Sequence, residues 1–256
     1  MNWARAIILK SPSELEIMRE AGRINALALQ AVREAIRPGV TTAELDEIAY
    51  EVIRKHGGKP AFLGVPGAYP YPATLTVSVN DELVHGIPGK RRLQEGDIVS
   101  VDCGTIFEGF VGDSAFTVGV GEISPLAKRL IEVTYRALEI GIEQLRPGKR
   151  VGDVGAAIQS YVEGEGFFLT KEYTGHGVGR SMWEGPQVPN YGVPGRGIPL
   201  RAGMVIAIEP MVLVGTERTK VLADQWTVAS ADGSLTAHVE HTVAVTEDGP
   251  VVLTVP

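Results

Sequence analysis

The 256-residue sequence predicts an α+β fold, in which helices pack on one side of a curved antiparallel sheet and the chain forms two related halves. Two repeated segments are the main evidence. The segment "RPGVTTAEL" at 37–45 returns as "RPGKRVGDV" at 146–154, and "LQEGDIVSVD" at 93–102 returns as "LRAGMVIAIE" at 200–209. Chance could produce one such match, but it does not easily produce several in the same order along the chain.

Helical patterns flank each copy of the first repeat. Before the first copy, Ser11 is a suitable N-cap, Pro12 suits the first helical position and Glu14 completes a capping box. Ser124 opens the second long helix in the same way. The glycine-containing segments "HGG" and "GEG" stop the shorter helix that follows each copy. Helices are therefore expected at about 13–36, 42–55, 125–145 and 151–163.

The second repeat predicts strands. Each copy reads Leu-x-x-Gly, an apolar run and then a carboxylate, as a buried strand ending in an acid would. After the first copy, "VDCGTIFEGFVGD" predicts a hairpin with its turn near Glu108 and Gly109. No Pro/Ser-rich linker or block of charge separates the halves. We therefore expect one domain over residues 1–256, with an internal repeat of roughly 10–120 and 121–253.

Composition and charge narrow the function classes. The formal net charge of −7 and the pI near 5.3, without any basic run, argue against a nucleic-acid-binding surface. Cys103 is the only cysteine, which excludes a disulfide framework and a cysteine-based zinc site. The chain shows no signal-peptide pattern, and no segment approaches the ~20 apolar residues of a membrane span. We expect a cytoplasmic protein that binds neither nucleic acids nor membranes.

Four carboxylates lie in apolar, strand-like segments. Asp102 and Glu209 occupy equivalent places in the second repeat, while Asp113 and Glu240 lie in apolar segments nearby. Buried like charges cost several kcal/mol each unless something neutralises them. These segments contain no lysine or arginine that would pair with the acids. A pair of divalent metal ions about 3.5–4 Å apart, bridged by carboxylates, is the other solution.

His176 lies in "GHGVGRSMWEGPQVPN" (175–190), which is too broken for a helix and too glycine-rich for an ordinary strand interior. A second His-Gly pair, at His85, corresponds to it in the other half. Taken singly, these residues have plainer interpretations: Asp102 as a strand-end acid, Glu240 as part of a surface cross-strand pair, and His176 as a loop residue capping a helix. Together with the repeat, they favour a metal centre.

With these residues in view, the sequence resembles the type I methionine aminopeptidases, two-metal peptidases of the pita-bread fold. The resemblance covers about residues 10–253 and is carried by several motifs in order. These are "VNDELVHGIP" (79–88), "DIVSVDCG" (97–104), "GDSAFTV" (112–118), "GHGVGRSM" (175–182), "EGPQVPN" (184–190), "IEPM" (208–211) and "HVEHTVAVT" (238–246). It implies a single catalytic domain that removes the N-terminal methionine from nascent proteins and peptides with a small second residue.

The resemblance also implies roles for individual residues. The metal ligands would be Asp102, Asp113, His176, Glu209 and Glu240, with Asp113 and Glu240 bridging two ions. Glu209 would also be a catalytic proton acceptor and donor, as water between the ions attacks the first peptide carbonyl. His85 would be a catalytic imidazole outside the metal ligands that stabilises developing charge. Such ligands suit cobalt, manganese or iron and do not exclude zinc.

A pocket for the methionine side chain is implied as well. Its walls would be Phe62, Tyr71, Met182 and Trp226, with Thr76 as a weaker candidate, although each of them could be plain core. Asn80 and Thr236 match positions near a monovalent-cation site in some relatives.

One position departs from the family. Its members normally carry a second histidine seven residues after the first, followed by Glu, and Trp183 stands there. The indole could donate a hydrogen bond to substrate from a shifted position, line the cleft, or pack under the 184–190 loop.

Other interpretations stay open from the sequence. Another pita-bread peptidase, of the aminopeptidase P or prolidase kind, would favour a proline-containing substrate. A non-catalytic binding protein on the same fold is suggested only by Trp183. The expected partners are nascent polypeptide N-termini, with the ribosome as a candidate place of action, and a monomer is the default.

Overall fold

The computed structural model describes residues 7–256, and within them four α-helices form close to the predicted positions. Ser11 caps the first helix by accepting the N–H of Glu14, whose carboxylate accepts the N–H of Ser11 in return. Thr41 and Glu44 form the same box at the second helix. The helices are α1 (Pro12–Ala35), α2 (Thr42–Lys55), α3 (Pro125–Glu143) and α4 (Val151–Gly164). None of them combines the length and apolar character needed to cross a membrane.

The strands before α3 include the predicted long hairpin. It consists of β4 (Ile98–Phe107) and β5 (Phe110–Gly119), joined at Glu108 and Gly109. These two residues have φ values of 46° and 78°, the left-handed pair that a two-residue hairpin turn favours. The other strands of this part are β1 (Lys59–Pro60), β2 (Leu75–Val79) and β3 (Glu82–Val84).

Shorter strands follow α4 and complete the sheets. They are β6 (Phe168–Leu169), β7 (Gly175–Gly177), β8 (Glu184–Val188), β9 (Val205–Ile208), β10 (Met211–Leu213), β11 (Thr219–Val221), β12 (Val228–Ser230), β13 (Thr236–His238), β14 (His241–Thr246) and β15 (Gly249–Val252). The largest sheet has the order β15-β14-β9-β7-β8, and β4 pairs with β1, β2 and β5 in another. Every strand pairing in the described chain is antiparallel, as the sequence predicts.

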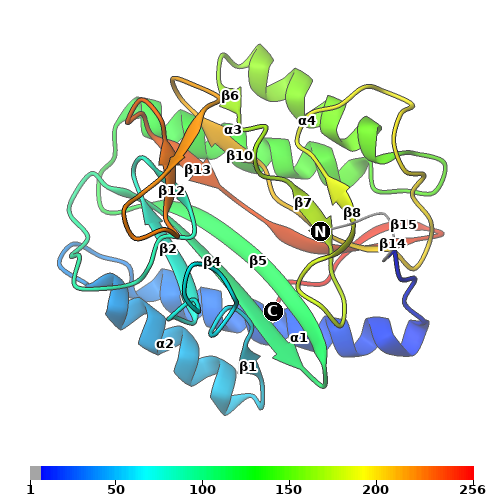
Figure 1. Ribbon diagram of the computed structural model, residues 1–256, viewed down its shortest axis with the longest axis horizontal. Coiled ribbons are helices and arrows are strands. Elements are labelled where there is room, and N and C mark those ends of the chain that lie inside the picture. The colour runs from blue at the N-terminus through cyan, green and yellow to red at the C-terminus, as the bar shows by residue number, and fades with distance from the viewer. Residues whose placement is uncertain (1–6) are drawn as a thin grey trace.

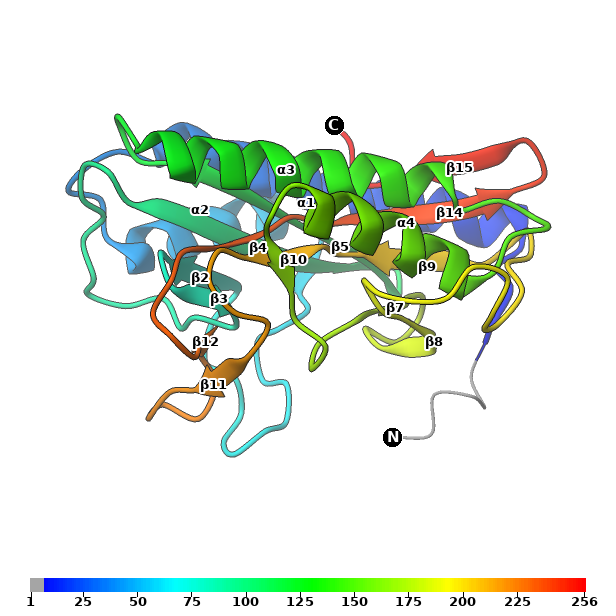
Figure 2. The same cartoon turned by 90° about the horizontal axis from the view of Figure 1, so that it is seen from above.

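The helices cover one side of the strand layer, which confirms the expected α+β arrangement. Figure 1 shows α1 and α2 along β4 and β5, and α3 and α4 on the other half of the molecule. In the view of Figure 2, the helices occupy the upper part of the molecule, with β14 and β15 beside them, while β3, β7, β8, β11 and β12 lie below. One apolar cluster joins α1 and α2 to the first strands, and another joins α3 and α4 to the later ones.

Two glycines bring α1 against β5. A side-chain carbon at Gly112 would lie 2.6 Å from the backbone nitrogen of Gly22, so the strand has no room for one here. A side-chain carbon at Gly22 would lie 2.3 Å from the carbonyl oxygen of Leu253, so the helix has no room for one either. Close backbone approach of this kind is a common reason for glycine inside an element. The contact fixes β5, the strand that carries Asp113, directly on the helical layer.

Candidate functional site

One cavity of about 100 Å³ collects every residue that the sequence assigned to the divalent metal centre, catalysis or the methionine pocket. Its wall also includes Val65, which the sequence did not suggest. The predicted residues in the wall are Phe62, Tyr71, Thr76, His85, Asp102, Asp113, His176, Met182, Trp183, Glu209, Trp226 and Glu240. The structure therefore brings together residues from both halves of the chain.

The two antiparallel sheets place the acids. Asp113 lies opposite Gly104 of β4, which is two residues after Asp102. Side chains two residues apart on a strand point to the same face, so both carboxylates lie on one face of the hairpin. Glu209 follows the last residue of β9. Glu240 lies just before β14, where its backbone exchanges hydrogen bonds with Ala115 of β5.

The electrostatics of this group are unfavourable for four ionised acids. Burial raises the pKa of Asp102 to about 7; the charge of Glu209 adds to this rise, while His238 opposes it. Burial likewise raises the pKa of Glu209 to about 7. The pKa values of Asp113 and Glu240 lie well above the usual carboxyl range, because these side chains are buried and face other carboxylates. Within residues 7–256, no lysine or arginine lies within 4.0 Å of any of the four.

These side chains suit divalent metal ions. Asp102 Oδ1, Asp113 Oδ1 and Glu240 Oε1 are buried and have no hydrogen-bond partner within the described residues. Asp113, His176 and Glu240 each offer a ligand atom within 4.8 Å of the others, while Asp102 and Glu209 lie outside that trio but in the same cavity wall. Carboxylate oxygens with one imidazole are a donor set for divalent transition metals.

The glycine-rich segment around His176 differs from the prediction, because it forms β7 inside the largest sheet. A side-chain carbon at Gly177 would lie 2.0 Å from the carbonyl oxygen of Gly185, and one at Gly175 would lie 2.5 Å from that of Ala207. The glycines therefore serve close contact between neighbouring strands. The sequence composition argued against an ordinary strand interior, whereas in the structure the tight spacing of the strands requires glycine here.

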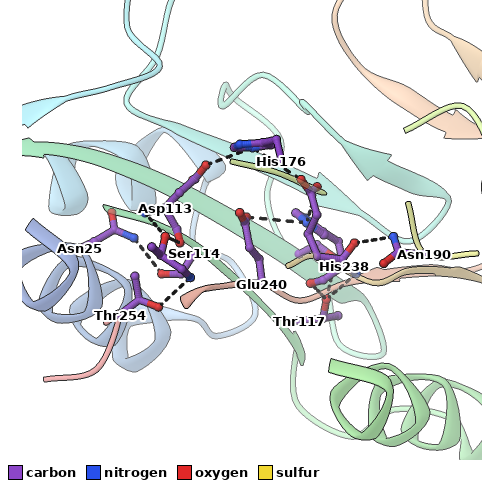
Figure 3. Close-up of polar contacts among 12 residues, drawn as sticks. Asn25, Asp113, Ser114, Thr117, His176, Asn190, His238, Glu240 and Thr254 are labelled. Carbon is purple, nitrogen blue, oxygen red and sulfur yellow. Dashed lines mark hydrogen bonds and ion pairs between the residues drawn. The ribbon is translucent and has the colours of Figure 1, made fainter. Parts of the chain in front are cut away.

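The tautomer of His176 follows from its hydrogen bond. Its Nδ1 lies 2.9 Å from the carbonyl oxygen of Gly177, which can only accept, so Nδ1 carries the hydrogen. The other ring nitrogen, Nε2, is then a free electron-pair donor. It lies 3.7 Å from Asp113 Oδ2 and 3.7 Å from Glu209 Oε1. Figure 3 shows the His176 ring directed towards Asp113. A backbone carbonyl that fixes the ring in this way is typical of metal-binding histidines.

His85 lies at the wall of the same cavity. Its backbone has a φ of 61°, uncommon for a residue with a side chain, and its ring meets Tyr173 edge-on with centroids 6.0 Å apart. Burial, with a smaller effect of His238, lowers the pKa of His85 to about 4. The imidazole is therefore neutral at pH 7.

A third histidine, His238, was not among the sequence candidates. Its Nε2 lies 3.5 Å from Glu209 Oε2 and 3.9 Å from Glu240 Oε2, and burial lowers its pKa. The signal was present, because His238 precedes Glu240 by two residues and an extended chain places such residues on one face. His238 was overlooked because its motif, residues 238–246, was used only to assign Glu240.

The apolar side of the cavity is built by the predicted pocket residues. Tyr71 and Trp226 meet edge-on with ring centroids 5.1 Å apart, and the Tyr71 hydroxyl donates to the carbonyl of Leu75. The indole of Trp226 covers Gly67, where a side-chain carbon would lie 2.3 Å from the ring. Phe62 and Met182 belong to the same apolar cluster. These side chains are at once core and cavity wall.

The loop that carries Met182 and Trp183 is tied to the start of the chain. Lys10 and Glu184 form a buried ion pair at 2.5 Å, and Glu184 Oε1 also accepts the N–H of Arg180. Trp183 is 40% exposed and lines the cavity, so it does not pack under the 184–190 loop. Its ring centroid lies 6.4 Å from that of His176.

Asn80 and Thr236 contact each other and are not among the residues that line the cavity. The Thr236 hydroxyl lies 3.2 Å from the carbonyl oxygen of Asn80 and 2.9 Å from that of Glu82, and the Thr236 N–H also donates to Asn80.

Comparison with known proteins identifies the family. The profile of metallopeptidase family M24 matches residues 16–247. Methionine aminopeptidase 1 of Bacillus subtilis is 51% identical over 248 residues, covering 97% of this chain and 99% of the relative. The crystal structure of a methionine aminopeptidase from Thermotoga maritima superposes with a TM-score of 0.95 and 47% identity, covering 98% of this chain and all of that chain.

A solved prolidase from Pyrococcus furiosus is similar to this chain in fold but much less so in sequence. It has a TM-score of 0.78 and 23% identity, and the match covers 97% of this chain but 66% of that chain. Identity at this level shows a shared fold only. The pita-bread architecture expected from the sequence is thus confirmed, and the chain belongs to metallopeptidase family M24 and, within it, to the methionine aminopeptidases.

Proposed function

We propose that this chain hydrolyses the first peptide bond of proteins and peptides that begin with methionine followed by a small residue. One observation carries the proposal: three buried carboxylates and a fourth, Glu209, whose side chain is 13% exposed, share a cavity with two imidazoles and an apolar wall. In the described chain, none of the four pairs with a lysine or arginine. The acids suit a metal pair, and the apolar wall suits a flexible thioether side chain. The relatives named methionine aminopeptidase support the same activity. We infer a single catalytic domain.

In this proposal, Asp113 and Glu240 would be shared by two divalent ions. Asp102 would hold one of the ions, and His176 and Glu209 would hold the other. The unpartnered oxygens of Asp102, Asp113 and Glu240 support this assignment, because each needs a cation or a donor. When bound, the two cations neutralise the acids and lower the pKa of the attacking water.

The protein's own groups then position the substrate and move the proton. Glu209 accepts a proton on a carboxylate oxygen and returns it to the leaving nitrogen. His85, neutral at pH 7 because its pKa is near 4, acts through a ring N–H that donates to the developing oxyanion. Tyr71 and Trp226 hold the methionine side chain and keep water from that part of the cavity.

Finer assignments follow from the same chemistry. Oxygen donors with one imidazole suit manganese, iron or cobalt, and zinc is within their range. We propose that the substrates are nascent polypeptide N-termini in the cytoplasm, met at the ribosome by a monomeric enzyme. A monovalent cation is proposed beside Asn80 and Thr236, where the carbonyl oxygens of Asn80 and Glu82 converge on the Thr236 hydroxyl.

The direct test is mass spectrometry of peptides incubated with the metal-loaded protein. Met-Ala and Met-Gly peptides should lose methionine, while Met-Leu peptides should remain largely intact, because a bulky second residue should not fit. Xaa-Pro peptides without methionine serve as the comparison for a prolidase or aminopeptidase P specificity. Faster cleavage of these peptides than of Met-Ala peptides would replace the proposed specificity, and no cleavage of any peptide would favour a non-catalytic binding role.

A further inference from the structure

His238 has no role in the proposed function, although its ring lies beside two of the acids, Glu209 and Glu240. It is the last residue of β13, and its Nε2 faces Glu209 Oε2 at 3.5 Å and Glu240 Oε2 at 3.9 Å. Figure 3 shows the His238 and Glu240 side chains directed towards each other. Within the described residues, the buried Nε2 has no hydrogen-bond partner at the present distances. The nearest groups that could take its hydrogen are these two carboxylates.

The backbone of His238 is fixed to the strands that carry the other two acids. Its N–H donates to the Thr117 hydroxyl at 3.0 Å, and that hydroxyl donates to its carbonyl oxygen at 2.6 Å. The hydroxyls of Thr117 and Ser100 lie 2.8 Å apart. Thr117 belongs to β5 with Asp113, and Ser100 belongs to β4 with Asp102. The ring is thus held in a defined position relative to the whole acid group.

We propose that His238 is a positioning residue, whose Nε2–H orients the carboxylate of Glu209 for its metal-binding and proton-accepting roles. A carboxylate that binds a metal is itself usually held by a hydrogen bond, and loss of such a partner typically weakens metal affinity. Glu209 depends on this, because within residues 7–256 its one hydrogen bond to a side chain, from Asn190, goes to its backbone carbonyl and leaves the carboxylate unheld. The inference rests on the proposed function of the site.

The test compares His238→Leu, which removes the donor, with His238→Gln, whose side-chain amide can donate from nearly the position of Nε2. His241→Gln is the matched control, since His241 lies three residues further on and its Nδ1 contacts Thr254 Oγ1 at 2.8 Å. Co²⁺ binding to metal-free protein is measured by titration calorimetry, together with the visible spectrum of the Co²⁺-loaded protein. Steady-state kcat and KM on a Met-Ala peptide complete the set.

His238→Leu should weaken Co²⁺ binding by roughly 10- to 100-fold and lower kcat more than it changes KM. His238→Gln should restore most of both losses, and His241→Gln should behave as the wild type. If His238→Leu does not fold, His238→Asn replaces it. The shorter asparagine side chain cannot place its amide where Nε2 lies, so the same losses of Co²⁺ affinity and kcat are expected.

Two results would overturn the inference alone. Wild-type affinity and kcat in His238→Leu would mean that the ring only fills space. A Co²⁺ spectrum changed in His238→Gln, with affinity lost as in His238→Leu, would mean that the imidazole itself binds the metal. Wild-type protein that binds no Co²⁺ and releases no methionine would instead overturn the proposed function, and the inference with it.

Discussion

The carboxyl groups of Asp102 and Glu209 have their pKa raised to about 7 by burial, so at neutral pH the metal-free cavity holds a mixture of acids and carboxylates. The pKa values of Asp113 and Glu240 are raised further, since both are buried and face other carboxylates. The pKa values of the two neighbouring histidines, His85 and His238, change in the opposite direction, because burial lowers them. Each side chain thus avoids charge in the absence of cations, and bound cations reverse that preference for the acids.

At the residue scale, Trp183 gives the first prediction. The family resemblance expects a histidine here that donates to the substrate carbonyl, whereas indole has a single N–H on a larger frame. Since Trp183 lines the cavity and is partly exposed, Trp183→His should fit and keep both metals. We expect kcat/KM on Met-Ala peptides to rise roughly tenfold, or about 1.4 kcal/mol of transition-state stabilisation.

Steady-state kinetics at matched metal occupancy would measure this, with Trp183→Ala as the control that should bring no improvement. Unchanged or lower kcat/KM in Trp183→His would show that the indole already serves the substrate.

At the scale of elements, β7 is an interior strand made of Gly-His-Gly. Its pairing with β9 and β8 is what aims His176 into the cavity. The second prediction is that Gly177→Ala destabilises the protein by about 1–3 kcal/mol, the usual cost of forced overpacking. The added carbon would meet the backbone oxygen of Gly185, which cannot rotate away. Metal affinity should fall too, because His176 is the next residue.

The matched control is Gly164→Ala at the end of α4, where an added carbon meets no heavy atom within 4 Å. It should leave the free energy of unfolding unchanged or slightly raised, since alanine favours a helix over glycine. Denaturant unfolding of both variants would measure the difference. Equal stabilities of the two variants would contradict the close-packed interpretation of β7.

Helix ends and the β4–β5 hairpin could be predicted from sequence because their signals are local. Ser11 with Glu14 and the pair Glu108–Gly109 each act within a few residues. The role of Gly177 depends on Gly185 of another strand, and local composition therefore suggested a loop. His238 was missed for a similar reason, since only the assembled sheet places it beside Glu209. The internal repeat related Asp102 to Glu209 over a long stretch of chain, and the family resemblance then implied the full set of proposed ligands.

For the whole molecule, burial of the acids makes metal-free stability depend on pH. An acid whose folded pKa is raised stabilises the fold while it stays protonated, and that contribution is lost as pH rises through the folded pKa. Between pH 7 and 8 the loss comes from acids with a pKa of about 7 or higher. His85 and His238 contribute little there, since they are neutral in the folded state and mostly neutral when unfolded.

The prediction is that the free energy of unfolding of the metal-free protein falls from pH 7 to pH 8, by up to about 1.4 kcal/mol per pH unit for each acid still protonated, and that its Tm falls with it. The metal-loaded protein should change less, because its acids are ionised at both pH values, and chelation should lower its Tm and abolish its activity. Differential scanning calorimetry of both forms at each pH makes the comparison. A gap in Tm that does not widen at pH 8, or full activity after complete chelation, would contradict the metal centre.

The distribution of the four acids has a consequence for how such a molecule could arise. Asp102 and Asp113 come from one half of the chain, and Glu209 and Glu240 come from the other. A polypeptide of half this length would carry a single pair of acids, so it could complete the cavity only by associating with a second copy of itself. Joining two copies end to end would remove the dependence on protein concentration, because the second pair is then always nearby. The fused copies could thereafter diverge, so that equivalent positions now carry an aspartate in one half and a glutamate in the other.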